Sequence, residues 1–288
     1  IKMANETTKD LMAFVPSVTF ELIPIKDLVA NQEYQRSLSE SHILRTAEDF
    51  DLYQVNPVKV SRRDGVNYVF NGQHTIEIIA LVSGSRDTPV WCMVYDDMSY
   101  TNEAHVFADQ QKYVKALSPF DIFMAHIEAK DEKYLMIRDL VESYHLEISY
   151  SKQQGCICAV GALERIYDKF GYHVLDRTLQ LCVGTWEGEI NSFSGNILSA
   201  IARLIVVYGE DLNNEIFIDH VGRQTVKAIG RTAKERRPGA LGYAEAMLLA
   251  YNNKCKYRLP MKRLYGNNAD EDIDENEDEN VESIQAEA

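Results

Sequence analysis

The residues with the clearest potential for chemistry lie at positions 71–75, where the sequence reads Asn-Gly-Gln-His-Thr. Residues 68–70 before them favour a strand, and the apolar residues after them favour a helix. A helix N-terminus exposes free backbone N–H groups and the positive end of the helix dipole, so phosphate groups bind there readily. A glycine at this place lets a ligand approach the backbone. The candidate phosphate-binding residues are Gly72, Gln73, His74 and Thr75.

Two interpretations of positions 71–75 remain open. They form a site for a nucleotide or another phosphate, or they form an ordinary strand-to-helix turn capped by Asn71. His74 is also the candidate catalytic residue, because its imidazole could act as a general base that Glu77 orients. In the alternative, His74 donates a hydrogen bond to a backbone carbonyl.

Carboxylates of the kind that a metal-dependent nuclease needs occur at Asp96, Asp97 and Glu103. The same residues are also placed to end a strand and to cap a helix. The sequence therefore predicts no metal site.

The elements that must position these candidates occupy residues 19–115, where short strands and short helices alternate. Strands are predicted over 19–25 and 88–97. Residues 56–70 have the pattern of a hairpin that turns at Asp64-Gly65.

Two further helices are predicted in this part of the chain. One covers residues 37–50, where Ser37 and Glu40 have the spacing of a capping box. The other covers residues 101–114, with Thr101 as its N-cap.

From about Leu117 every predicted element is a helix, and no strand is predicted. The most apolar helix, residues 196–209, contains Arg203 and is too short to span a bilayer comfortably, so no membrane partner is expected. Its predicted buried face consists of Ile197, Ile201, Leu204, Ile205 and Tyr208, and Gly209 is the predicted C-cap. The sequence thus predicts an α+β protein with an N-terminal extension (1–17), a mixed domain (18–116), an all-helical domain (117–265) and a disordered acidic tail (266–288).

The net charge of −14 conceals regions of different sign. Residues 266–288 carry 10 acidic and no basic side chains, whereas residues 223–263 carry 11 basic and 2 acidic ones. Such a basic region suits the phosphate backbone of DNA. The alternatives are a solvated helix face and an internal partner for the acidic tail. The candidate nucleic-acid-binding residues are Arg223, Lys227, Arg231, Lys234, Arg236, Arg237, Lys254, Lys256 and Arg258.

Spacing suggests how these cations are arranged. Arg223, Lys227, Arg231 and Lys234 would form a single stripe on one continuous helix. The second group surrounds Tyr257. Residues 132–166 contain a helix, a long gap and a helix, which is a further candidate for a helix-turn-helix.

The 5 cysteines are an odd number and are scattered along the chain. This usage favours reduced thiols over a disulfide framework. We therefore expect a cytoplasmic protein.

The order of elements over roughly the first 120 residues resembles the ParB/sulfiredoxin superfamily. The resemblance rests on Tyr34-Gln35-Arg36, Asn56-Pro57-Val58, Gly72-Gln73-His74-Thr75 and the Leu-Ser-Pro at residues 117–119. The later helices resemble those of phage and plasmid ParB-like proteins. The resemblance implies a nucleoside triphosphate with Mg²⁺ near residues 72–75, and DNA as a partner.

The sequence departs from the superfamily at positions that carry its chemistry. Gln73 replaces the nucleophilic cysteine of sulfiredoxin, and Thr75 replaces an arginine. Gln110 and Gln111 stand where ParB has glutamate and asparagine, and an amide binds Mg²⁺ less well than a carboxylate. We therefore expect nucleotide binding without efficient turnover. Charge for the phosphates would come from Arg36, Arg62 or Arg63.

Three functional hypotheses follow. The first is a DNA-binding protein of a phage or mobile element that holds a nucleotide or phosphate at residues 72–75. The second is a ParB-like nuclease or nucleotidase that uses His74 and a divalent ion, so enzymatic activity is left open. The third is an inhibitor of a host nucleic-acid-binding defence system, with a host protein as partner and the acidic regions mimicking nucleic acid.

Overall fold

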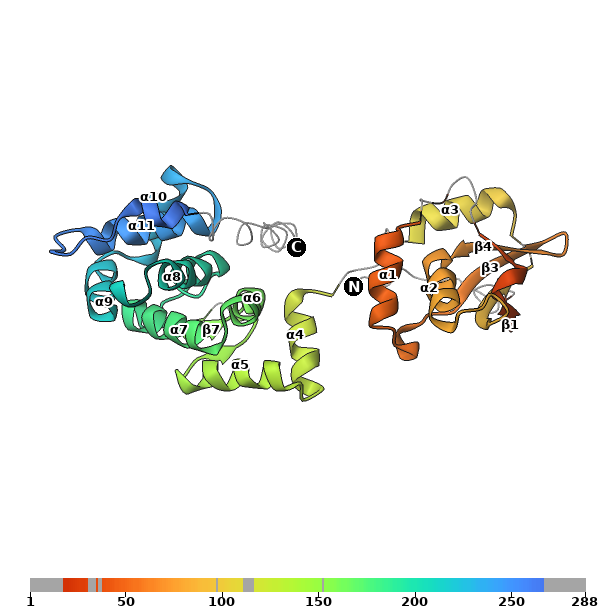
Figure 1. Ribbon diagram of the computed structural model, residues 1–288, viewed down its shortest axis with the longest axis horizontal. Helices are drawn as coiled ribbons and strands as arrows, with labels where there is room; N and C mark the ends of the chain where they lie inside the picture. Colours follow the sequence, from red (N-terminus) through yellow and green to blue (C-terminus); the bar gives the residue numbers. More distant parts are fainter. Residues whose placement is uncertain are drawn as a thin grey trace, which may run out of the picture. The chain divides into compact units, whose positions relative to one another are not determined.

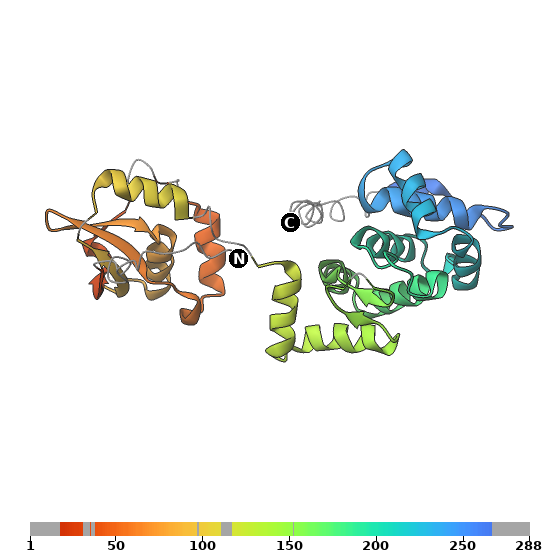
Figure 2. The same cartoon turned by 180° about the vertical axis from the view of Figure 1, so that it is seen from behind.

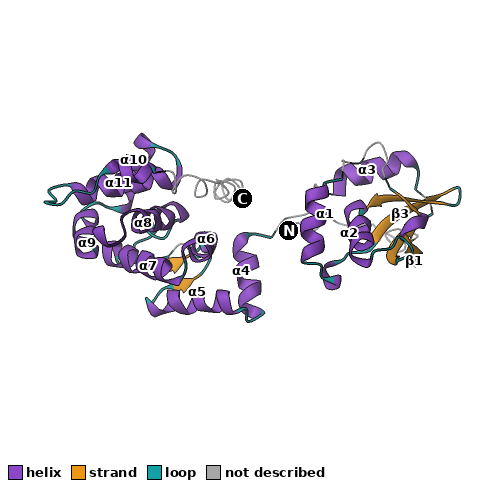
Figure 3. Cartoon of the chain, in the orientation of Figure 1, coloured by secondary structure: helices purple, strands orange, loops and turns teal. Residues whose placement is uncertain are grey.

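The computed structural model of this chain describes residues 18–30, 35, 38–96, 98–110, 117–151 and 153–266. The chain divides into two compact units, Ile1–Lys115 and Ala116–Ala288, and each has its own hydrophobic core. The first unit mixes a sheet with helices, and the second is mostly helical (Figure 3). This arrangement confirms the α+β class predicted from the sequence.

A mixed sheet forms the centre of the first unit. Its strands are β1 (Val18–Pro24), β2 (Leu28–Val29), β3 (Val58–Arg63), β4 (Val66–Asn71) and β5 (Pro89–Tyr95), in the order β1-β5-β3-β4-β2. β3 and β4 form the predicted antiparallel hairpin, and Asp64 and Gly65 at its turn have φ of 53° and 78°. Two successive positive φ values are typical of the type I′ turn that joins twisted strands.

The helices of the first unit pack around this sheet (Figure 1). They are α1 (Glu40–Glu48), α2 (Gln73–Ser83) and α3 (Tyr100–Gln110), with short 3-10 turns η2 (Ile25–Asp27) and η3 (Leu52–Gln54). Ile76 of α2 is buried in one core with Val58, Val60 and Val69 of the sheet. α1 packs against α2, and α3 contacts β4.

The structure corrects two predicted helix starts. The N-cap of α1 is Ser39, whose hydroxyl accepts a first-turn backbone N–H (3.4 Å), whereas the predicted Ser37 lies outside the described residues. Ser99 accepts a backbone N–H at the start of α3 (3.2 Å), so Thr101 lies inside the helix. In each case a neighbouring serine performs the capping role.

The second unit surrounds one buried helix, α8 (Gly195–Tyr208), which packs against α6, α7 and α11 (Figures 1 and 2). The remaining helices are α4 (Pro119–Glu128), α5 (Glu132–Ser143), α6 (Val160–Phe170), α7 (Tyr172–Trp186), α9 (Asn214–Gly222), α10 (Val226–Arg236) and α11 (Gly239–Asn252), with turns η4 (Gly209–Asp211) and η5 (Met261–Tyr265). The predicted buried face of α8 is confirmed, and Gly209 is its C-cap. Within the described ranges, no helix combines the length and apolar character needed to cross a bilayer.

Two very short strands, β6 (Glu147–Ile148) and β7 (Cys156–Ile157), form a parallel pair between α5 and α6. The sequence predicted no strand there, since two residues are too few to show an alternating pattern. The connection between α5 and α6, residues 144–159, is far longer than the roughly three or four residues of a helix-turn-helix. The helix-turn-helix predicted over residues 132–166 therefore lacks its turn.

Candidate functional site

The strand–helix corner, residues 71–75, lies where β4 ends and α2 begins. Gly72 is the N-cap of α2, and its φ of 104° lies in the left-handed region that favours glycine. A Cβ added to Gly72 would lie 3.2 Å from the side chain of Val58 and 3.3 Å from its Cα. The glycine is therefore required by its backbone conformation and by close packing against β3.

His74 is held in place by the segment that starts α1. Its Nε2 accepts a hydrogen bond from the backbone N–H of Ser39 (3.2 Å), and its ring meets the ring of His42 edge-on at 5.6 Å. Glu77, which was predicted to orient His74, instead forms a bidentate pair with Arg86 (2.8 and 3.1 Å). The carboxylate of Glu77 therefore does not orient the His74 ring in the structure.

The other polar residues of the corner are partly or fully buried within the first unit. Asn71 donates from its side chain to Oε1 of Gln110, and α2 has no side-chain cap, so the predicted cap by Asn71 is wrong. Gln73 is buried and Thr75 is half-buried. Arg36, the predicted source of charge for a phosphate, lies outside the described residues.

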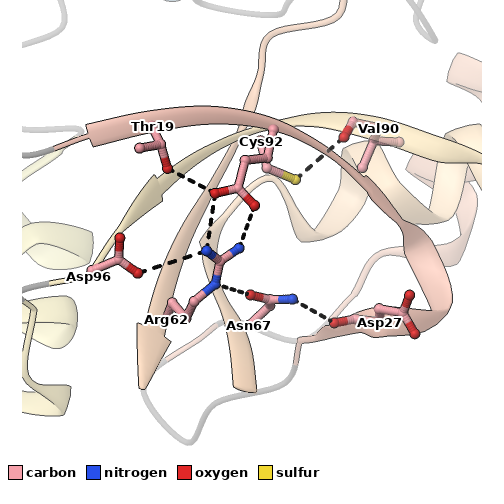
Figure 4. Close-up of polar contacts among 8 residues, drawn as sticks. Thr19, Asp27, Arg62, Asn67, Val90, Cys92 and Asp96 are labelled. Atoms are coloured by element: carbon pink, nitrogen blue, oxygen red, sulfur yellow. Dashed lines mark hydrogen bonds and ion pairs between the residues drawn. The ribbon is translucent and has the colours of Figure 1, made fainter. Parts of the chain in front are cut away.

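Arg62 and Arg63, the other predicted sources of charge, both bind carboxylates. Arg62 forms a bidentate pair with Glu21 (3.0 and 2.6 Å), which links β3 to β1 across β5 (Figure 4). The hydrogen bonds from Arg62 hold the pKa of Glu21 below its ordinary value. Arg63 donates to Glu103 (2.6 Å), whose side chain has no exposed surface. Neither guanidinium is left free for a phosphate.

The carboxylates considered for a metal site do not converge. Glu103 binds Arg63, Asp96 lies 3.9 Å from Arg62, and Asp97 lies outside the described residues. In the part of the chain that the structure describes, no group of three or more His, Cys, Asp or Glu side chains is arranged to hold a metal ion.

A cavity of about 430 Å³ lies in the first unit. Its lining is mainly apolar and includes Leu52, Val82 and Trp91. No residue of the strand–helix corner lines it, so this cavity provides no space for a ligand at residues 71–75.

In the second unit, the predicted basic stripe is divided between two helices. α9 ends at Gly222, and the hydroxyl of Thr225 caps α10 by accepting the N–H of Ala228 (3.2 Å). Arg223 is the C-cap of α9 and pairs with Asp219. The prediction of one continuous helix through Arg223 is therefore wrong, because the threonine cap starts a new helix after it.

The remaining cations of the stripe lie on α10. Lys227, Arg231 and Lys234 are exposed, and their spacing places them on one side of the helix, which we call the α10 face. The residues buried on the opposite side of α10 are Val226, Ile229 and Ala233. None of the three cations forms an ion pair or a hydrogen bond with a described residue.

α11 supports the α10 face from behind. The two helices are joined by residues 237–238 and pack together, as antiparallel neighbours with a short link do (Figure 1). Their contact is close, because a Cβ on Gly242 of α11 would lie 2.9 Å from the carbonyl oxygen of Ala233 on α10, and one on Gly230 would lie 3.2 Å from the Tyr243 hydroxyl. The α10 face is thus presented on a tightly packed helix pair.

Two other predicted DNA contacts, Arg236 and Arg237, bind a carboxylate on α11. Their Nε atoms lie 2.6 and 3.0 Å from the carboxylate oxygens of Glu245, whose side chain is 3% exposed. The Tyr265 hydroxyl donates to the same carboxylate (2.8 Å), and burial together with this bond raises the pKa of Tyr265. Both arginines neutralise a buried charge, which the sequence alone did not reveal.

The last predicted group lies in a loop after α11, residues 253–258, which we call the basic loop. Lys254, Lys256, Tyr257 and Arg258 are all exposed there. None of these three cations forms an ion pair with a described residue, although Lys256 Nζ lies 5.3 Å from the centre of the Tyr257 ring. The basic loop and the α10 face therefore hold the predicted DNA contacts that have no carboxylate partner among the described residues.

Comparison with known proteins gives a family and a distant structure. The model of DUF6551, a family of unknown function, matches residues 29–263. Among curated proteins, none matches the chain. A solved structure to which the chain is similar is the C-terminally truncated chromosome-partitioning protein ParB from Caulobacter crescentus complexed with CTP-gamma-S, with a TM-score of 0.34 and 11% identity over 80% of this chain and 99% of that chain. These values are too low to establish a shared fold, so the details of the ParB resemblance remain predictions.

Proposed function

Because the chain belongs to the DUF6551 family, whose description names no function, we propose a function from its own residues: it binds nucleic acid by the phosphate backbone. The binding surface is the α10 face. The observation that carries the proposal is that Lys227, Arg231 and Lys234 are exposed together without a partner among the described residues. Unpaired cations on one surface are the electrostatic footprint of phosphate binding.

The charges on α10 are unfavourable for the protein alone. Lys227 and Arg231 stand four residues apart, where like charges repel each other. Lys227 also lies in the first turn of α10, next to the positive end of the helix dipole. A bound polyanion would remove both penalties, because its phosphates neutralise these side chains.

The link before α10 supports an approach to duplex DNA. Residues 223–225 join α9 to α10, and the helices of a helix-turn-helix are separated by about three or four residues. In that motif the second helix enters the major groove. An α10 placed in this way would bring its exposed cations to the groove and the phosphates beside it.

The proposal is tested by measuring binding of the protein to a DNA duplex about two helical turns long. Fluorescence anisotropy at low salt monitors the binding. The test variant carries Lys227→Gln, Arg231→Gln and Lys234→Gln. We expect it to bind at least about tenfold more weakly than the wild type, because three phosphate contacts are lost.

A matched control separates the α10 face from net charge. It carries Lys26→Gln, Arg45→Gln and Lys130→Gln, which remove the same number of charges at exposed positions outside α10; of these, Lys26 forms a surface pair with Asp87 (2.6 Å). The proposal predicts near wild-type binding for this control. Equal weakening of the two variants would mean that net charge, and not the α10 face, determines binding.

A further inference from the structure

We infer that the basic loop binds an unpaired nucleotide of single-stranded nucleic acid, with the base stacked on Tyr257 and the phosphates on Lys254, Lys256 and Arg258. This inference rests on the proposed function and deepens it, since it names a form of nucleic acid and a second contact. It assigns to Tyr257 a role that phosphate binding alone does not need.

Tyr257 is an aromatic side chain with most of its ring in water. It is 74% exposed, although tyrosine usually buries much of its ring against apolar neighbours. Cations flank it on both sides in the sequence. Aromatic rings among cations are the means by which proteins bind single strands, because every base can stack on a ring and every phosphate can meet a cation.

The basic loop is fixed at its base by the protein itself. The side chain of Asn252 donates to the carbonyl of Leu259 and accepts from its N–H, each at 2.8 Å. Leu259 is buried in the core of the second unit, and the Cys255 thiol donates to the carbonyl of Tyr257 (3.2 Å). A loop held in this way loses little conformational entropy when a ligand binds.

The cations of the basic loop differ in their partners from Arg263, the next arginine along the chain. Arg263 binds Asp211 (2.6 Å) and the carbonyl of Val207 (2.8 Å), so it joins η5 to the end of α8 and to η4. Lys254 and Arg258 have no such partner among the described residues. Their charge is therefore available to a ligand.

The basic loop lies at the end of the α10–α11 pair where α10 begins. Tyr251, near the end of α11, contacts through its carbonyl the Nδ1 of His220 on α9 (2.7 Å), six residues before α10 starts. In both views the deep blue loop after α11 projects from one end of the helical unit (Figures 1 and 2). One nucleic-acid ligand with a paired and an unpaired part would reach both surfaces.

Two probes of equal length test the inference, a blunt duplex and single-stranded oligothymidine, with the full chain and its Tyr257 variants. Tyr257→Ala is expected to weaken oligothymidine binding about tenfold or more, because one stacked base is lost. The same variant is expected to bind the blunt duplex within about twofold of the wild type. Tyr257→Phe keeps the ring, so it should bind both probes like the wild type.

Other outcomes overturn the inference. Equal weakening on the two probes, or a Tyr257→Phe variant that behaves like Tyr257→Ala, would exclude base stacking. A synthetic peptide of residues 267–288 serves as a third probe. If Tyr257→Ala weakens binding of this peptide more than binding of oligothymidine, the basic loop binds an acidic segment instead. Failure of the proposed function has a different signature, in which the wild type binds neither probe or the three-glutamine α10 variant binds as the wild type does.

Discussion

The strand–helix corner and the α10 face both carry polar residues at suggestive spacing, but they differ in the partners of those residues. At the corner, His74 accepts from the backbone of Ser39, and Asn71 binds Gln110. On the α10 face the cations have no partner among the described residues. Polar groups that the fold has already satisfied are weaker evidence for a ligand than polar groups that it leaves unsatisfied.

The same contrast occurs within the basic region itself. Arg236 and Arg237 carry the same charge as Lys234 and lie two and three residues after it in the sequence, yet both arginines bind the buried Glu245. Removing a partner from a buried carboxylate is costly, so these arginines have a structural role that the α10 face does not share. Predictions that separate structural from ligand-binding residues therefore test this account.

The largest effect is expected where α11 holds the α10 face in place. Gly242→Ala would put a Cβ 2.0 Å from the carbonyl oxygen of Arg237 in the link and 2.9 Å from that of Ala233 on α10, so both the link and α10 must move away from α11. Alanine favours a helix over glycine by about 1 kcal/mol, but a backbone clash of this size outweighs that gain. We expect a net loss of roughly 3 kcal/mol in the free energy of unfolding, measured with urea.

Gly161→Ala in α6 is the control for this substitution. Its Cβ would meet the nearest atom, on the flexible Arg165 side chain, at 3.6 Å, which is ordinary contact. This variant should keep or slightly raise the stability of the wild type, by at most about 1 kcal/mol. Similar losses in both variants would contradict close packing of α10 on α11.

The next effect concerns the corner. Gly72→Ala combines a left-handed backbone with contacts to Val58 at 3.2–3.3 Å, so we expect a loss of roughly 2 to 3 kcal/mol in the free energy of unfolding. Gly84→Ala, with φ of 69° and open space around its Cβ, should cost only about 1 kcal/mol. Thermal or urea unfolding of the two variants measures the difference.

Equal losses in the two variants would mean that Gly72 has no packing role.

The same melting experiments, repeated with nucleoside triphosphates and Mg²⁺, test whether the protein binds the nucleotide that was predicted for the strand–helix corner. A rise in the melting temperature of the wild type would support the nucleotide site that the sequence predicts.

The smallest effect has the opposite sign. Lys227→Gln should raise the stability of the unbound protein by roughly 0.5 kcal/mol, because it removes a cation from the first turn of α10 and a repulsion with Arg231. Lys234→Gln is its control, since Lys234 lies in the last turn, where the helix dipole favours a cation. A stability gain at Lys234 as large as that at Lys227 would contradict this electrostatic explanation.

Local patterns predicted much of the fold. The hairpin at Asp64-Gly65 and the buried face of α8 were predicted because turn chemistry and helical spacing act over a few residues. Helix starts were less accurate, because several hydroxyl residues compete for the same cap, as Ser99 and Thr101 do. The two-residue strands β6 and β7 carry too little pattern to be predicted.

The partners of the cations could not be predicted in the same way. Arg236 meets Glu245 only because α11 folds back on α10, and Arg63 meets Glu103 40 residues further along the chain. The sequence therefore grouped structural and unpaired cations into one candidate surface. Arg36 and residues 267–288 lie outside the described residues, so their predicted roles stay predictions.

The most direct measurement of the central claim is the salt dependence of duplex binding by the wild type and the three-glutamine α10 variant. Each phosphate contact contributes about 0.9 to the slope of log K against log salt concentration. The variant is therefore expected to have a slope smaller than that of the wild type by roughly 3, while the Lys26, Arg45 and Lys130 control keeps the wild-type slope. The same slope in the wild type and the α10 variant would contradict phosphate binding by Lys227, Arg231 and Lys234.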